Sequence, residues 1–491
     1  MHKRFISNEY LIFFGVYLLA NLGMFFILNS IYWDDWLISQ GGNAQIIAIF
    51  SEQAATFLNL EAYSHILLLK VGPWIYRLLT LIFYFFIGVL FNLILKSISQ
   101  INKNHRLICV ILFLSLPLSI ARIELVVLRY TVCLLLFMIA WNIYEKNKFI
   151  SLFLFFISFN TSSLLVFYFF PVVYFYLRQK VMGNFLSEAY NFFKNNFALL
   201  FLPFIYYILK IIYYKPTGMY INYNQNYSIK NITESVMIQL YNFLTIKTNI
   251  YIFLCLIPFT YIILNNKLRD ISLYKKDFYF LFFSGLILLI FGAFPYWILG
   301  HAPTFYDWSS RHQLLLPFGA SLIATSFCTL IPIKFFRHIF SAIIALFISV
   351  NYYSYIELYR DWEKQKQVIE LLSENAYINN ASIIIFSDDS REVNAWGREF
   401  RFYEFNAMMY KAYNSQNHFA LLAGNSSYEN FKLGVYDVYF KPRYLAADFK
   451  RNVTAQPVCV AITNRGVNEH SFSKLFGYAK PNISLKVSNC Y

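Results

Sequence analysis

Long apolar runs separated by short polar links dominate the first 350 residues of the chain. Runs such as 10–28, 74–95 and 278–299 are about 20 residues long, which is the length that a helix needs to cross a bilayer. Further apolar runs follow one another up to residue 353. The pattern predicts a polytopic α-helical membrane protein with about 11 spans within residues 1–355.

One apolar run differs from the others because it is longer and is interrupted by polar residues. Residues 149–177 are broken by Asn160-Thr161-Ser162-Ser163, and basic residues flank the run at both ends. Since both ends carry the charge typical of the cytoplasmic side, we expect a hairpin of two short helices that turns at the polar break. A single tilted span is the alternative, and it would invert the topology of everything that follows.

The pattern changes after residue 356, where polar residues become frequent. Helical periodicity and short apolar runs predict a separate α/β domain over residues 356–491. Its expected elements are helices at 360–375 and 400–413 and strands at 381–386, 458–462 and 483–487. A domain of this size can bury a core of its own.

Composition and charge agree with a membrane location. The chain of 491 residues is 58% hydrophobic and 21% aromatic, and its net charge is +15. Many of the basic residues lie in short links between apolar runs, as the positive-inside rule expects, so the charge reports topology and not a nucleic-acid partner. His2, Lys3 and Arg4 place the N-terminus in the cytoplasm, and the tail then lies outside the membrane on the opposite side.

The cysteines and the absence of common motifs limit the kinds of catalytic site that the sequence favours. Cys459 and Cys490 lie in the tail, and whether they form a disulfide depends on a geometry that the sequence does not give. The chain has no CxxC, HExxH, GxGxxG, Walker or GxSxG pattern. Zinc, nucleotide and serine-hydrolase chemistry are therefore disfavoured.

An acidic motif directly follows the first apolar run. In Ile31-Tyr32-Trp33-Asp34-Asp35-Trp36 two adjacent carboxylates are flanked by tryptophans, whose rings favour the headgroup zone. Asp34 or Asp35 is a candidate general base, and its neighbour would orient an acceptor or ligate a divalent cation. An ordinary interfacial loop with a Trp anchor is the alternative interpretation.

Other polar residues fall on the same, outer side of the predicted topology. Charges at a membrane boundary are costly unless they are paired or hydrated, so their convergence predicts a polar cavity. The candidates for binding a donor phosphate are Arg122, Arg129, Lys215, Arg311 and His312. The supporting candidates are Glu124, Tyr220, Tyr223, Asn224 and Asp307. Simpler alternatives are an Arg122–Glu124 ion pair and a Lys215 side chain that extends to lipid headgroups.

The acidic motif Asp34-Asp35 in the first outer loop, the many spans, the helical hairpin and the outer α/β tail resemble the GT-C superfamily of membrane glycosyltransferases. The resemblance covers residues 1–355, and it implies an inverting enzyme of the bacterial inner (plasma) membrane. Its donor would be a sugar on undecaprenyl phosphate, its acceptor a surface glycan or lipid, and its first-loop acid the catalytic base. No oligosaccharyltransferase tail motif is present.

Two other functions compete with sugar transfer. A polymerase of O-antigen or capsule repeat units would use a lipid-linked oligosaccharide as donor and acceptor and would depend on outer-loop arginines. A flippase or transporter of lipid-linked sugars would carry broken spans, internal repeats and polar residues near the middle of the membrane. The charges of this chain gather at one face, which favours the enzyme.

Overall fold

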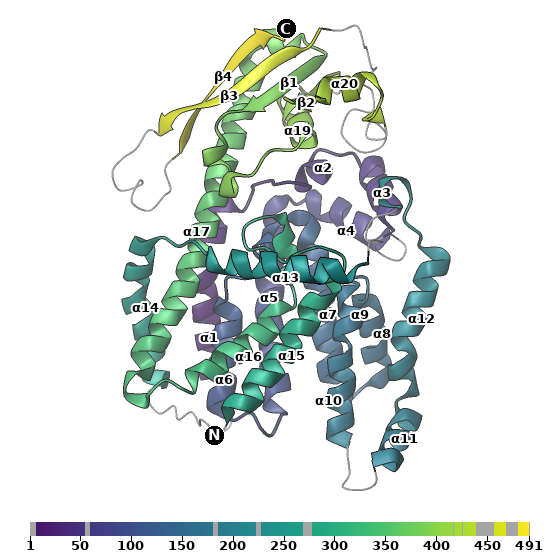
Figure 1. The fold of residues 1–491 in the computed structure, drawn as a ribbon, viewed down its shortest axis with the longest axis vertical. Coiled ribbons are helices and arrows are strands. Elements are labelled where there is room, and N and C mark those ends of the chain that lie inside the picture. The colour runs from purple at the N-terminus through teal and green to yellow at the C-terminus, as the bar shows by residue number, and fades with distance from the viewer. Residues whose placement is uncertain are drawn as a thin grey trace.

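A helical bundle carries a small sheet at one end, and one long helix joins the two parts (Figure 1). The structure is a computed structural model. It describes residues 6–54, 59–179, 185–221, 227–268, 277–415, 417–424, 426–437, 456–467 and 480–490.

The helices of the bundle come in the first two thirds of the chain. They are α1 (Ile6–Asn21), η1 (Leu22–Ile27), α2 (Asp35–Ser39), α3 (Asn43–Gln53), α4 (Leu60–Leu69), α5 (Pro73–Lys96), α6 (Lys103–Ser115), η3 (Ile120–Ile123), η4 (Leu125–Val127), α7 (Leu128–Ile143), α8 (Lys148–Ser158), α9 (Ser163–Phe167), α10 (Phe169–Gln179), α11 (Phe185–Asn195), α12 (Phe197–Tyr213), η5 (Gly218–Tyr220), α13 (Ile229–Leu244), α14 (Ile250–Leu268), α15 (Phe278–Trp297), η7 (Trp308–Gln313) and α16 (Leu316–Cys328).

The remaining elements connect to the tail or build it. They are α17 (Ile333–Glu374), α18 (Ala376–Asn379), β1 (Ile383–Asp388), η8 (Arg391–Val393), η9 (Ala395–Gly397), α19 (Phe402–Tyr413), β2 (Phe419–Leu422), α20 (Ser427–Lys432), β3 (Val458–Val467) and β4 (Pro481–Asn489).

Long apolar helices confirm a helical membrane protein, but they do not confirm about eleven spans. Among the described residues, five helices are long and apolar enough to cross a bilayer. They are Glu9–Ile27, Pro73–Lys96, Leu125–Ile143, Phe278–Trp297 and Ile333–Glu374. A pair bent by 63°, Leu186–Asn195 and Phe197–Tyr213, raises the number to six if it is one span. Other predicted spans fold as apolar helices of only 10–17 residues, such as Lys148–Ser158 and Leu316–Cys328.

Local chemistry explains several helix ends and contacts. Asn102 begins α6 by accepting backbone hydrogen bonds from residues 104 and 105 with its side chain. Residues 159–162, three of which are polar, separate α8 from α9. Gly285 of α15 and Gly319 of α16 face each other so closely that a Cβ on Gly285 would lie 2.8 Å from the Gly319 carbonyl oxygen. Small residues thus let these two helices pack backbone to backbone.

Helix α17 corrects the prediction of a final span near 339–353 followed by a separate tail helix at 360–375. The structure has one helix of 42 residues, which begins in the bundle and ends beneath the sheet. No proline or glycine occurs between residues 353 and 360, so nothing in the sequence interrupts the helix there. The helix contacts α1 and α14 in the bundle and α19 and β4 in the tail.

The tail contains a four-stranded mixed sheet with the order β2-β1-β3-β4. Strand β1 pairs in parallel with β2 and β3, and β4 pairs antiparallel to β3. The predicted strands at 381–386, 458–462 and 483–487 and the helix at 400–413 are confirmed to within a few residues, although β3 and β4 are longer than predicted. The sequence analysis did not predict β2.

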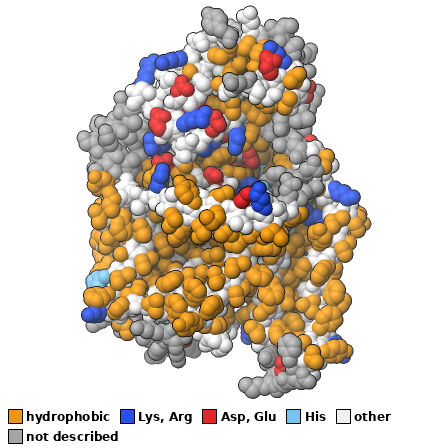
Figure 2. All heavy atoms as spheres, in the orientation of Figure 1, with side chains coloured by type: hydrophobic (Ala, Val, Ile, Leu, Met, Phe, Trp, Pro, Cys, Tyr) orange, Lys and Arg blue, Asp and Glu red, His pale blue; other side chains and the backbone are white. Residues whose placement is uncertain are grey.

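Cys459 and Cys490 form a disulfide, with Cα atoms 5.2 Å apart. Cys459 lies in β3, and Cys490 follows the end of β4, so the bond joins the paired ends of these two strands. Figure 2 shows a surface on which hydrophobic side chains cover most of the lower part, whereas charged side chains gather above it. On this face the apolar surface covers the bundle, and the charged region includes the boundary between the bundle and the tail.

Candidate functional site

The acidic motif lies where the bundle meets the tail. The Tyr32 hydroxyl donates a hydrogen bond of 2.7 Å to the Leu358 carbonyl oxygen in α17. The Trp36 indole N–H donates one of 2.8 Å to Oε1 of Gln365, about two turns farther along the same helix. Both side chains are fully buried, so the upper part of α17 fixes the loop at two points on either side of the acids.

Asp34 is half-buried and is oriented by the tail. The Tyr403 hydroxyl in α19 donates a hydrogen bond of 2.7 Å to Asp34 Oδ1. Burial raises the pKa of the Asp34 carboxyl, and the bond from Tyr403 and the charges of Arg311 and Arg401 partly oppose this rise. Asp34 is therefore a carboxyl of increased basicity with a fixed orientation.

Asp35 is fully enclosed, at 0% exposure. Its Oδ1 accepts a hydrogen bond of 3.1 Å from the Val126 backbone N–H, whereas its Oδ2 is buried without a hydrogen-bond partner among the described residues. Burial raises its pKa to about 7, and the charge of Asp34 adds to the rise, while Arg77 lowers it. The two adjacent acids thus differ in environment, which separates their proton affinities.

Glu124 adds a third carboxyl. It is fully buried, and neither carboxyl oxygen has a hydrogen-bond partner in the part of the chain that the structure describes. Burial and then the charges of Asp35 and Asp34 raise the pKa of the Glu124 carboxyl well above its usual value. Arg122 does not pair with it. Instead Arg122 donates a hydrogen bond to Asn21 and lies over the Tyr84 ring, on the bundle side of the site.

Arg77 is a residue of this site that the sequence analysis missed. Its guanidinium is fully buried and donates hydrogen bonds of 2.7 Å to the Leu28 carbonyl oxygen and 2.8 Å to that of Ser30. It thereby fixes the backbone that leads into the acidic motif, and its charge acts on Asp35 and Glu124. An arginine inside the apolar run 74–95 is the signal that would have identified it.

Arg311 and His312 lie in η7. The Arg311 guanidinium lies over the Trp308 ring at 4.3 Å and acts electrostatically on Asp34. The His312 ring stacks on His301 at 5.2 Å and contacts Tyr296 at 4.7 Å. Burial, followed by the charges of Arg311 and His301, lowers the His312 pKa well below its usual value, so the ring is neutral. The neutral His312 ring can donate one N–H hydrogen bond, and the adjacent Arg311 supplies positive charge, so the pair is suited to contact an anion.

The other predicted phosphate ligands lie apart from the acids. Arg129 forms an ion pair with Glu61, which itself lies 3.9 Å from His65 in α4. Lys215 is exposed in the loop after α12, and Tyr220 is half-buried in η5.

Two further supporting candidates, Tyr223 and Asn224, lie outside the described residues. Asp307 has a local role, because its Oδ1 accepts hydrogen bonds from the Thr304 hydroxyl and the Ser309 N–H at the start of η7.

The tail supplies a buried arginine and aromatic rings that no sequence pattern identified. Arg398 donates hydrogen bonds of 2.8 and 3.2 Å to Asp361 and two of 2.9 Å to Glu404. Its guanidinium also lies 4.8 Å from the Trp33 ring, which stacks on Trp396 at 6.2 Å.

Trp33 and Trp396 both adopt a left-handed backbone conformation, with φ values of 43° and 55°. This conformation costs about 1–2 kcal/mol for a residue with a side chain. It persists only where the surroundings hold it, as at many functional sites. The strained tryptophans therefore mark the contact between the acidic motif and the tail as a constrained region.

The described residues around the acidic motif do not form a metal-binding site. No group of three or more His, Cys, Asp or Glu side chains is placed to hold one within the described ranges. Arg77 and Arg311 already supply positive charge near Asp35 and Asp34. We therefore derive no chemical step from a divalent cation, which the sequence analysis had considered for Asp34 and Asp35.

The raised pKa of Asp35 predicts a pH-dependent stability. A carboxyl whose pKa rises on folding from 3.8 to about 7 stabilises the fold fully below 3.8, and this contribution is lost as the pH rises through 7. We expect Asp35→Asn to raise the thermal midpoint relative to the wild type more at pH 8 than at pH 5. Thermal unfolding in detergent measures this, with Asp389→Asn in an exposed position as the control. An equal effect at both pH values would contradict the prediction.

Searches with this chain find no matching protein-family model, no matching curated protein and no matching solved structure, so its function is argued from the geometry of the site.

Proposed function

We propose that the protein is a GT-C-like membrane glycosyltransferase that moves a sugar from a polyprenyl-phosphate carrier to a glycan or lipid acceptor. The observation that carries the proposal is the half-buried Asp34 carboxyl, oriented by Tyr403 and facing the positive field of Arg311. A base with increased proton affinity next to an anion-stabilising group is the pair that glycosyl transfer from a phosphate requires.

The proposed reaction assigns one role to each of these groups. Asp34 accepts the proton of an acceptor hydroxyl while the hydroxyl oxygen forms a bond to the anomeric carbon of the sugar. The bond between that carbon and the phosphate oxygen breaks, and its electron pair leaves with the polyprenyl phosphate. Arg311 stabilises the charge of the departing phosphate. Attack opposite to the leaving group inverts the anomeric centre.

Of the three neighbouring carboxyls, we assign the role of base to Asp34 and not to Asp35 or Glu124. The pKa of Glu124 is raised well above its usual value and that of Asp35 to about 7, because both carboxyls are buried and lie near other acids. Asp34 is the most exposed of the three carboxyls, since Asp35 and Glu124 are buried. An acceptor hydroxyl reaches a half-buried carboxylate more readily than an enclosed one.

The proposed location is a bacterial plasma membrane, with the N-terminus in the cytoplasm and the tail outside. The Cys459–Cys490 disulfide supports an outer tail, because disulfides persist in oxidising compartments. An outer tail also places the acidic motif, which contacts it, on the side where surface glycans are built.

Binding of undecaprenyl phosphate tests the donor assignment. We expect Arg311→Gln to weaken binding of this probe by about 10-fold to 100-fold, because a hydrogen bond to a charged group contributes about 1.5–3 kcal/mol. Native mass spectrometry of the solubilised full chain measures the binding. Arg391→Gln is the matched control, since Arg391 forms an exposed ion pair with Glu399 in the tail. Unchanged binding in the Arg311 variant would contradict the assignment.

A further inference from the structure

Helix α13 lies across the bundle, whereas most of the other long helices run along it (Figure 1). It connects the segment after α12 to α14. The Ser228 N–H donates a hydrogen bond of 3.2 Å to the Ile298 carbonyl oxygen just before the helix, and the Lys247 N–H bonds to the Tyr306 hydroxyl just after it. Both ends of the helix are thus anchored to the segment that leads into η7.

The face of α13 that packs on the protein is largely polar. Four of its six buried or half-buried positions are polar, namely Asn231, Ser235, Gln239 and Asn242, and the other two are Ile232 and Val236. Gln239 accepts a hydrogen bond of 2.8 Å from the Trp297 indole N–H, and Asn231 donates one of 3.2 Å to the Ile298 carbonyl oxygen. These polar side chains therefore have their partners inside the protein.

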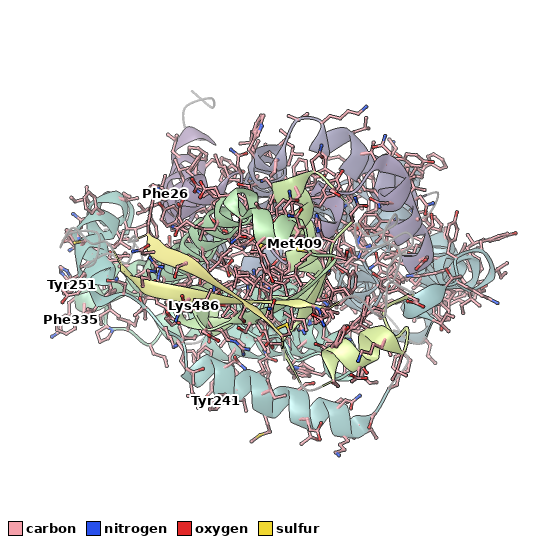
Figure 3. The ribbon with its side chains drawn as sticks, turned by 90° about the horizontal axis from the view of Figure 1, so that it is seen from above. Phe26, Tyr241, Tyr251, Phe335, Met409 and Lys486 are labelled. Carbon is pink, nitrogen blue, oxygen red and sulfur yellow. A yellow bond between two sulfur atoms is a disulfide. The ribbon has the colours of Figure 1, made fainter. Side chains whose placement is uncertain are left out.

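The opposite face of α13 is apolar and exposed. At about 100° per residue, six exposed side chains fall within an arc of about 120°, which also holds the half-buried Val236. They are Ile229, Thr233, Met237, Leu240, Phe243 and Leu244. All six are exposed, and Leu244 is 82% exposed. Lys230 and Glu234 lie beyond one edge of this arc, and Figure 3 shows Tyr241 on the outer side of the helix, away from the centre of the molecule.

An amphipathic helix of a water-soluble protein has the reverse arrangement, with its apolar face turned inward. The apolar arc of α13 is also continuous with a lipid-type surface, because the neighbouring helices expose large apolar side chains as well. Examples are Phe204 and Ile208 in α12 and Leu254 and Ile262 in α14. The acyl chains of a bilayer would cover the exposed apolar side chains of all three helices.

We infer that α13 is an interfacial helix that lies flat in the boundary of the bilayer, with its apolar arc in the acyl chains and Lys230 and Glu234 at the water. The helix then sets the level of the membrane surface beside Trp297 and η7. A lipid headgroup at that level lies next to the loop that carries Arg311. The inference concerns the lipid contact of α13 and holds whether or not the protein transfers a sugar.

Spin labels along the apolar arc test the inference in the full chain. We use Cys255→Ser as the background, because Cys255 is the exposed free cysteine of the described residues and the other three are buried. Single cysteines replace Thr233, Met237, Leu240 and Leu244, and a nitroxide is attached to each. The protein is placed in nanodiscs of phosphatidylethanolamine and phosphatidylglycerol. Collisions with oxygen and with a water-soluble nickel chelate then give the depth of each label.

We expect all four labels to favour oxygen several-fold over the Glu234→Cys control and to lie at the same depth. A helix that spanned the membrane would instead separate the first and last labels by about 16 Å in depth, at 1.5 Å per residue. That gradient would overturn the inference. Free access of the nickel chelate to all four labels would also overturn it, as would labels that are immobilised and reached by neither reagent, which indicate a protein partner.

Discussion

Asp34→Asn is expected to lower the rate of sugar transfer by about 100-fold or more. The asparagine keeps an oxygen that accepts the hydrogen bond from the Tyr403 hydroxyl, so the fold of the junction is preserved. It removes the carboxylate that we propose takes the proton of the acceptor, and a positioned base contributes about 100-fold to 10,000-fold to such a step. The measurement is transfer of sugar in membranes that contain equal amounts of wild-type and variant protein.

Two other substitutions make this result specific. Glu429→Gln removes a carboxylate from an exposed position of the tail and is expected to leave transfer unchanged. Asp35→Asn is expected to reduce transfer less than Asp34→Asn does, because Asp35 is enclosed and partly protonated at neutral pH. If Asp35→Asn abolishes transfer while Asp34→Asn retains it, the base is Asp35 and not Asp34.

Arg398→Met is expected to destabilise the tail by about 3–5 kcal/mol. The substitution leaves the carboxylates of Asp361 and Glu404 without their buried partner, and both are 0% exposed. Breaking a buried ion pair by removing one partner has a cost of that size. Hydrogen exchange of α19 in the full chain measures the effect, since 3 kcal/mol corresponds to about a 100-fold faster exchange in this helix.

Arg391→Met is the matched control for this experiment. Arg391 pairs with Glu399, but both side chains are about half exposed, at 53% and 50%. Exposed pairs contribute about 0–1 kcal/mol, so exchange of α19 should change by less than about tenfold. Equal exchange in the two variants would show that the buried network around Arg398 does not hold the tail together.

The sequence predicted the membrane class and much of the tail, because both depend on local patterns. Apolar run length identifies helices such as α5, and alternation of short apolar runs identifies β1, β3 and β4. The span count was less predictable because several apolar runs fold as short helices whose length is set by packing within the bundle. The single helix α17 was missed because the change in composition near residue 356 was taken as a change in structure.

The acidic motif was predictable as a candidate site, but its partners were not. Asp34 and Asp35 are adjacent in the sequence and follow a span, whereas Tyr403 reaches Asp34 from a position 369 residues farther along the chain. Arg122 was predicted to bind the donor phosphate, yet its guanidinium packs on the Tyr84 ring in the bundle. Side-chain direction depends on tertiary packing, and no periodicity in a single sequence reports it.

The most direct test of the proposed function is a mass comparison of surface glycans and lipid-linked intermediates. Cells that lack the protein are compared with cells that regain the wild type or the Asp34→Asn variant. The account predicts that one sugar unit is missing from each glycan or lipid acceptor in the cells without the protein and in the Asp34→Asn cells, and that the wild type restores it. Complete restoration by Asp34→Asn would contradict the account, and so would accumulation of whole unpolymerised repeat units.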